Sequence, residues 1–194
     1  SFAIAARETQ HIRFGPLVSP VTFRSPVDVG RMAAQLDELS GGRFVMGMGA
    51  GWNEAEHVAY GIPFPGARER IERLGESILL VKALWTQSPA TFEGRYYRLD
   101  GADCLPKPPG GRPLLLIGGN GERRTLRLVA EHADEWNSTG GGLENYARRV
   151  EVLARHCEAV GRDPSTIRRS LMASSLFGSI QAALDAATER AMAG

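Results

Sequence analysis

The chain has 194 residues, a formal net charge of +1 and 23% charged residues, which is the composition of an ordinary globular domain. The nearly neutral charge gives no reason to expect nucleic acid or an anionic membrane as a partner, and no apolar run of about 18 residues predicts a transmembrane helix. Cys104 and Cys157 lie far apart and outside any metal-ligand spacing. We therefore expect one domain over residues 1–194, no metal site and a cytoplasmic location.

Helix and strand patterns alternate along the chain. Residues 2–8 predict a helix end and residues 11–20 a first strand, and Ser25-Pro26 predicts a helix start because serine caps and proline suits the first turn. The later elements, in order, are a strand over 44–49, a short helix over 54–60, a long helix over about 71–85, a β excursion over 91–99 within an insertion at 88–113, a strand over 114–117, a helix from about 122, a strand over 134–137, a helix over 143–160, a strand over 169–177 and a final helix.

Five strands that alternate with helices predict a parallel sheet with right-handed crossovers. Two architectures have this order of elements, an open doubly wound sheet and a (β/α)₈ barrel. A complete barrel usually needs about 250 residues, and this chain of 194 residues opens on a helix tail. If the fold is a barrel, its N-terminal units are therefore expected to be missing.

Two of the expected strands end in glycine-rich turns, Gly49-Ala50-Gly51 and Gly118-Gly119-Asn120-Gly121. Glycine lacks a Cβ, so a ligand can approach the main chain and bind its N–H groups. The second turn precedes a helix, and helix N-termini bind anions. The alternatives are close strand–helix packing at the first turn and a tight strand-to-helix connection at the second. The two turns together predict a ligand site at the carboxyl edge of the sheet.

The chain also resembles the luciferase-like monooxygenase superfamily, most closely the branch that uses the deazaflavin coenzyme F420. The similarity runs from about residue 12 to residue 177 and rests on the order of several motifs. These are Leu39-Ser40-Gly41-Gly42-Arg43, Gly49-Ala50-Gly51-Trp52-Asn53-Glu54-Ala55-Glu56-His57, Tyr60-Gly61-Ile62-Pro63-Phe64-Pro65, Gly118-Gly119-Asn120-Gly121-Glu122-Arg123-Arg124-Thr125 and Ala133-Asp134-Glu135-Trp136-Asn137.

This resemblance implies a (β/α)₈ barrel of the luciferase-like type whose first two strands and last strand are absent from the chain. It also implies a flavin-type ring across the C-terminal mouth, a small organic substrate and a homodimer. The function that it favours is F420-dependent hydride transfer. An FMN-dependent luciferase-like monooxygenase and a truncated, non-catalytic cofactor-binding remnant are the alternatives.

The resemblance also assigns cofactor-binding positions. It places the cofactor phosphate on Gly118, Gly119, Asn120 and Gly121, with Arg123 or Arg124 and Thr125 as additional donors. An arginine fork can hold phosphate through two hydrogen bonds, whereas the negative charge of Glu122 argues against phosphate. The resemblance places Val18 and Ser19 around the ring, on a strand that in this family often carries a strained peptide or bulge. The first glycine turn, with the Trp52 that follows it, lies around the ring as well and comprises Gly49, Ala50 and Gly51.

His57 is the candidate catalytic residue, because a histidine in a helix near the mouth can donate a proton or bind a phosphate oxygen. The alternative is a surface or helix-packing residue. Trp52 has a similar alternative, which is packing beneath the next helix. Asn53 and Glu54 are interpreted as helix caps, and Glu54, Glu56 and His57 do not have the spacing of a metal site.

Overall fold

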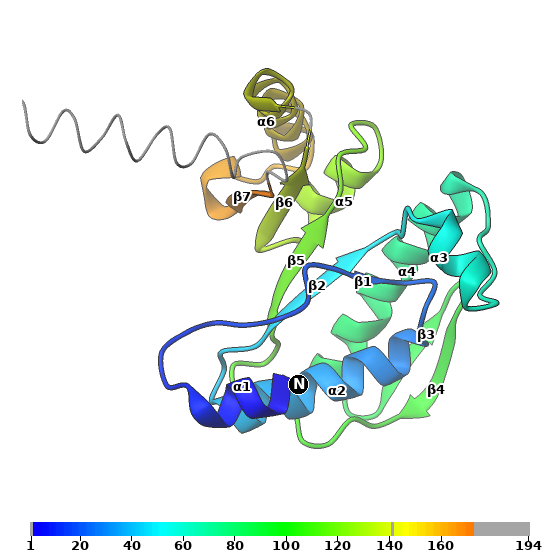
Figure 1. Ribbon diagram of the computed structural model, residues 1–194. Helices are drawn as coiled ribbons and strands as arrows, with labels where there is room; N and C mark the ends of the chain where they lie inside the picture. The colour runs from blue at the N-terminus through cyan, green and yellow to red at the C-terminus, as the bar shows by residue number, and fades with distance from the viewer. Residues whose placement is uncertain (1, 141, 173–194) are drawn as a thin grey trace, which may run out of the picture.

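The computed structural model describes residues 2–140 and 142–172 (Figure 1). Within these residues, five parallel strands form one sheet in the order β1-β2-β5-β6-β7. The strands are β1 (Ser19–Pro20), β2 (Val45–Gly49), β5 (Leu114–Gly118), β6 (Glu135–Thr139) and β7 (Arg168–Met172). The helices are α1 (Phe2–Glu8), α2 (Pro26–Ser40), α3 (Glu54–Ala59), α4 (Ala67–Thr86), α5 (Thr125–His132) and α6 (Gly142–Ala159), and a 3₁₀ helix covers Pro164–Thr166.

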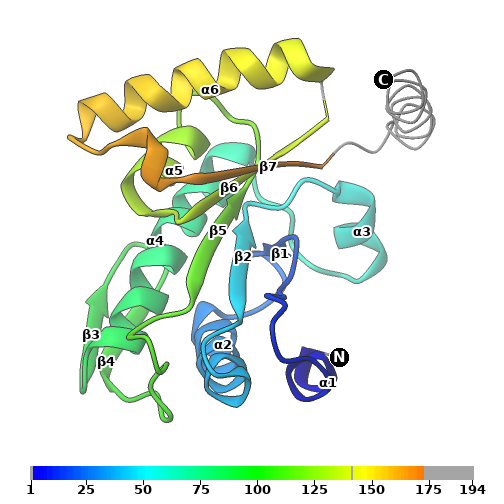
Figure 2. The ribbon, with the colours of Figure 1, turned by 90° about the vertical axis from the view of Figure 1, so that its left-hand side faces the viewer.

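The order of the strands in the sheet is their order in the chain. A doubly wound sheet reverses its strand order at a switch point, and no reversal occurs among the described strands. Helices α2, α4, α5 and α6 pack in succession along one side of the sheet (Figure 2). This arrangement is that of a (β/α) barrel, and the doubly wound alternative is wrong.

The hydrophobic core lies between the sheet and these helices. Alternate strand residues point to opposite faces, and Met46 and Met48 of β2 share the buried cluster with Leu115 and Ile117 of β5. The helix side of that cluster includes Leu74, Ile78 and Val81 of α4. The apolar burial therefore fixes which face of each strand is turned toward the helices, and it sets the register that brings the strand ends together.

The predicted helix start at residue 26 is confirmed. The Oγ of Ser25 accepts a hydrogen bond from the backbone N–H of Val27, and Pro26 is the first helical residue. Helix α2 ends at Ser40, before Gly41. None of the helices in the described residues is long and apolar enough to cross a bilayer.

Two elements differ from their expected bounds. The strand predicted over 11–20 is wrong, because only Ser19–Pro20 pairs with β2 as a strand, and Phe14 forms a single bridge to Phe44. Pro16 lies between these pairings and has no N–H to donate. The helix predicted from about residue 122 begins at Thr125. Residues 173–177 of the last predicted strand, and the final helix, lie outside the described residues.

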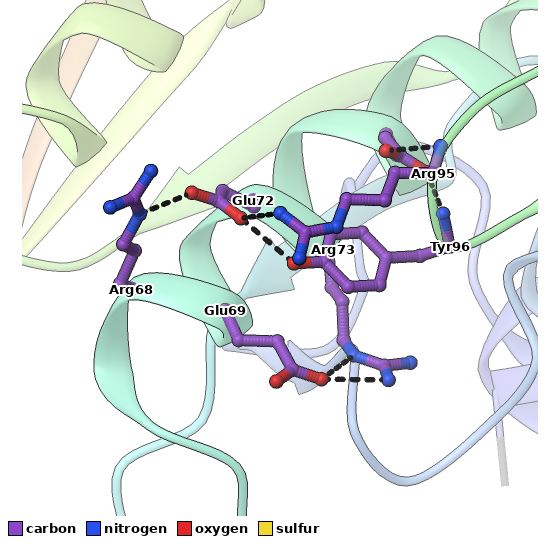
Figure 3. A network of polar contacts seen from close by, with 7 residues as sticks. Arg68, Glu69, Glu72, Arg73, Arg95 and Tyr96 are labelled. Carbon is purple, nitrogen blue, oxygen red and sulfur yellow. Dashed lines mark hydrogen bonds and ion pairs between the residues drawn. The ribbon is translucent and has the colours of Figure 1, made fainter.

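The expected β excursion is a hairpin of β3 (Ala90–Glu93) and β4 (Arg98–Ala102). Glutamates of α4 hold its tip. The Glu76 carboxylate accepts hydrogen bonds from the backbone N–H groups of Arg95 and Tyr96, both at 2.8 Å. Figure 3 shows Glu72 beside them, where it accepts hydrogen bonds from Arg68 Nε at 2.7 Å and from the Tyr96 hydroxyl at 2.8 Å. The hairpin is thereby fixed on the helix side of the sheet.

An ion pair joins the amino ends of β5 and β6. The Arg112 guanidinium donates to both carboxylate oxygens of Asp134, at 2.5 and 2.7 Å, and the backbone N–H of Leu115 adds a third bond at 2.8 Å. Burial acts to raise the pKa of Asp134, but these donors outweigh it, so the pKa lies below its usual value. Catalytic groups of such barrels lie at the opposite, carboxyl edge, and the amino edge serves stability.

Candidate functional site at the carboxyl edge of the sheet

The two glycine turns follow neighbouring strands. β2 and β5 are parallel, with Gly47 opposite Leu116 and Met48 opposite Ile117. Gly49 and Gly118 therefore end their strands side by side, and a Cβ built on Gly49 would lie 3.7 Å from the Gly118 carbonyl oxygen. The expectation that both turns share the carboxyl edge is confirmed (Figure 2).

Val18 occupies the space above these two strand ends. A Cβ on Gly49 would lie 2.5 Å from Val18 Cγ2, and a Cβ on Gly118 would lie 2.9 Å from Val18 Cγ1. The peptide bond between Leu17 and Val18 is cis. Both glycines are thus required for close packing of Val18, which belongs to the segment before β1 and not to a helix, so this contact is not the strand–helix packing that was the alternative for the first turn. Because Val18 covers Gly49 and Gly118, a ligand can reach the main chain only at the residues that follow them in each turn.

The first turn continues through Gly51, whose φ of +80° favours glycine. A Cβ there would lie 3.2 Å from Thr22 Oγ1, and the Gly51 carbonyl accepts a hydrogen bond from Arg70 Nε at 3.3 Å. The next residue, Trp52, is 84% exposed. Packing of Trp52 beneath the next helix is therefore wrong, and the indole stands in solvent at the end of β2.

His57 is 1% exposed. Its Nδ1 lies 2.6 Å from the Asn53 carbonyl oxygen, which can only accept, so Nδ1 donates there. Its Nε2 lies 2.7 Å from Thr22 Oγ1, a hydroxyl that can donate or accept. The rings of Phe23 and Phe64 flank it at 4.8 and 4.6 Å between centroids. With both ring nitrogens engaged, the geometry favours the helix-packing alternative, and the catalytic role stays a prediction.

Asn53 caps α3, as expected. Its Oδ1 accepts a hydrogen bond from the backbone N–H of Glu56 at 3.3 Å. Because its carbonyl also accepts from His57, Asn53 fixes the chain that leaves the first turn. Within the described ranges, no group of three or more His, Cys, Asp or Glu side chains could hold a metal ion.

The second turn is tied to β6. The Gly119 N–H donates to the Asn137 carbonyl at 3.1 Å, and the Gly119 carbonyl accepts from Trp136 Nε1 at 2.9 Å. Asn120 donates through Nδ2 to the Thr139 carbonyl at 2.5 Å and accepts through Oδ1 from Ser138 Oγ at 2.9 Å. The Asn120 side chain is therefore part of the support of the turn, and only its main chain is open to a ligand.

The amides that follow are free. The N–H groups of Gly121, Glu122 and Arg123 have no hydrogen-bond partner among the described residues, and they lie just before α5, where the helix dipole adds positive potential. The Arg123 side chain is exposed. Thr125 is 5% exposed, and its Oγ1 would lie 2.7 Å from a Cβ on Gly121. This arrangement suits an anion such as phosphate.

Helix α6 supplies residues that sequence reasoning missed. Arg148 pairs with the Glu122 carboxylate at 2.8 Å, which compensates the charge that argued against phosphate. His156 Nε2 lies 2.7 Å from the Glu122 carbonyl oxygen, so it supports the same turn. Arg149 donates to Ser138 Oγ at 3.4 Å, while its Nε is buried without a partner among the described residues. Spacing along the sequence does not signal these contacts, because they join separate elements.

The family model that describes luciferase-like monooxygenases matches residues 2–194. The chain belongs to the luciferase-like monooxygenase family. The resemblance stated from its motifs is thereby confirmed.

Proteins similar to this chain differ in the reactions that their names describe. The F420-dependent glucose-6-phosphate dehydrogenase of Kineococcus radiotolerans is 32% identical over 170 residues, which cover 86% of this chain and 49% of that protein. The F420-dependent tetrahydromethanopterin reductase of Methanopyrus kandleri has a TM-score of 0.78 at 23% identity, over 88% of this chain and 52% of that one. A type II Baeyer–Villiger monooxygenase from Pseudomonas putida, in complex with FMN, has a TM-score of 0.70 at 22% identity. The match covers 87% of this chain and 50% of that one.

The structural similarities show the fold, which is that of the luciferase-like barrel enzymes. The chain spans about half the length of the curated relatives that it matches.

Proposed function

We propose that the carboxyl edge of this luciferase-like sheet binds coenzyme F420 and that the protein transfers a hydride to or from a small organic substrate. The observation that carries the proposal is the row of free amides at Gly121, Glu122 and Arg123, in the turn that follows β5, the strand paired with β2. Family membership and a relative named as F420-dependent support the choice of coenzyme. FMN is the second candidate, because a family structure of similar fold contains it.

The residues present fit a phosphate-bearing coenzyme. The free amides and the Arg123 guanidinium would hold the phosphate, and Thr125 lies beneath them. Arg148 keeps the Glu122 carboxylate paired, so this charge does not repel the anion. The fit rests on the main-chain N–H groups of residues 121–123, which no other acceptor among the described residues occupies.

The ring would lie toward the first turn. Val18 and Ser19, with Ala50 and Gly51, would form the surface next to it, and Val18 is held by its contacts with both strand ends. The coenzyme supplies the hydride chemistry. The protein's part is to position the two reactants and exclude water.

Binding titrations test this proposal. We expect the purified chain to bind F420 with a dissociation constant at least about tenfold below that for FMN, a difference of roughly 1.4 kcal/mol. Arg123→Ala should weaken F420 binding several-fold, because a charged donor to phosphate is lost. Arg127→Ala is the matched control, since Arg127 is an exposed arginine of α5 that pairs with Glu131.

Tighter binding of FMN would favour the flavin monooxygenase. Binding of neither coenzyme would overturn the proposal and leave the non-catalytic remnant.

A further inference from the structure

A groove of about 460 Å³ lies among the loop after β1, the start of α4 and the tip of the β3–β4 hairpin. This side groove is lined by residues 21, 22, 24 and 25, by residues 63–65, 69 and 73, and by Tyr97. None of the residues assigned above to the coenzyme lines it. Its volume is within the roughly 300–1,000 Å³ that is typical of small-molecule sites. The side groove is therefore a second candidate site, separate from the glycine turns.

The aromatic walls of the side groove are held by contacts with other residues. The Phe64 ring lies 3.8 Å from the Arg70 guanidinium and 4.6 Å from the His57 ring, measured to its centroid. On the hairpin, the backbone N–H of Tyr97 donates to the Glu76 carboxylate at 3.2 Å. A ligand would thus meet walls that are already ordered, and its binding would fix few additional groups.

One charge in the side groove has no partner. Two arginines and one glutamate line it, so its net charge is +1. Glu69 and Arg73 pair with each other at 2.8 Å (Figure 3). Beside the groove, Arg68 pairs with Glu72 at 2.7 Å. Arg24 is exposed and forms no hydrogen bond or ion pair with any described residue, so its guanidinium is open to an anion.

A second unpaired polar group lies close to Arg24. A smaller cavity shares Val21 and Arg24 with the side groove, and Ser77 of α4 lines it as well. Ser77 is 0% exposed, and its Oγ has no hydrogen-bond partner in the described part of the chain. Because a buried hydroxyl is costly to leave unpaired, this end of the groove favours a polar group over an apolar one.

The ligand that suits these features is a planar monoanion. A guanidinium binds a carboxylate through two parallel hydrogen bonds, and aromatic side chains favour edge-to-face contact with another ring. A phosphate monoester suits the groove less well, because it carries close to two negative charges. The second charge would face Glu69, and no further unpaired cation lines the groove among the described residues.

We propose that the side groove binds a small aromatic carboxylate, with the carboxylate on the Arg24 guanidinium and the ring against Phe64 and Tyr97. This ligand is neither the coenzyme nor the molecule that exchanges a hydride with it. The proposal therefore does not rest on the function proposed above.

Isothermal titration calorimetry with 1-naphthoate tests the proposal on the purified chain. We expect a dissociation constant below about 1 mM, and at least about tenfold weaker binding of the neutral 1-naphthalenemethanol, which has the same ring. Arg24→Gln should weaken binding of 1-naphthoate about tenfold. Arg24→Lys should retain part of the affinity, because lysine keeps the charge without the fork. Arg68→Gln is the matched control, since Arg68 is an exposed arginine of α4 that does not line the groove.

Three results would overturn the proposal: no binding of 1-naphthoate, equally tight binding of the neutral alcohol, or equal loss of affinity in Arg24→Gln and Arg68→Gln. Displacement of 1-naphthoate by F420 would also overturn it, because the carboxylate would then be bound at the glycine turns. Binding of 1-naphthoate that F420 leaves unchanged supports a separate site. Failure of F420 itself to bind would refute the proposed function alone.

Discussion

Trp136→Ala is expected to lower the free energy of unfolding by about 3–5 kcal/mol. Trp136 is 0% exposed, and its ring stacks on Tyr146 at 5.7 Å between centroids. Alanine would leave a large cavity between β6 and α6, and it would remove the donor to the Gly119 carbonyl. Urea unfolding followed by circular dichroism measures the change.

Phenylalanine variants separate packing from support of the turn. Trp136→Phe and Trp85→Phe each remove one buried indole N–H, so each should cost about 1–3 kcal/mol for the unsatisfied carbonyl. Only Trp136 donates to the second glycine turn, whereas Trp85 donates to Gly30 in α2. We therefore expect weaker F420 binding in Trp136→Phe alone. Equal loss of binding in both variants would show that general destabilisation is the cause.

Gly49→Ala should cost about 1–3 kcal/mol, the usual effect of overpacking. The new Cβ would lie 2.5 Å from Val18 Cγ2, closer than any van der Waals contact. Val18 is β-branched, so few χ1 rotamers are open to it to relieve the clash. Val18→Ala removes the methyl groups that cause the clash. Equilibrium unfolding of the two single variants and the double variant measures their coupling.

We expect the double variant to be more stable than the sum of the single effects by about 1 kcal/mol or more. Gly110→Ala is the control, because nothing lies within 4 Å of a Cβ built there. Additive effects of Gly49→Ala and Val18→Ala would mean that Val18 does not occupy the space above the two strand ends.

Features set by local sequence could be predicted. Ser25 and Pro26 begin α2, and Asn53 begins α3, through contacts with residues two and three positions away. The meeting of the two glycine turns was also predictable, because the carboxyl ends of parallel strands lie at one edge. The family motifs added the barrel, which the structure confirms, whereas the coenzyme that they imply stays a proposal.

Features set by tertiary contacts could not be predicted. Thr22, which satisfies His57, lies 35 residues away in the chain, and nothing in the spacing indicates that this histidine is buried. Arg148 neutralises Glu122 only because α6 packs beside α5. The filling of both strand ends by one Val18 side chain likewise depends on where the segment before β1 crosses β2.

Amide hydrogen exchange with and without F420 tests most directly whether the two turns form one coenzyme site. Slower exchange is predicted at two separate places on addition of F420: the free amides from Gly121 to Arg123 and the first turn at Gly51 and Trp52. The amino edge near Leu115 should not change, since its N–H already donates to Asp134. Protection at only one turn, or at the amino edge instead, would contradict a shared site.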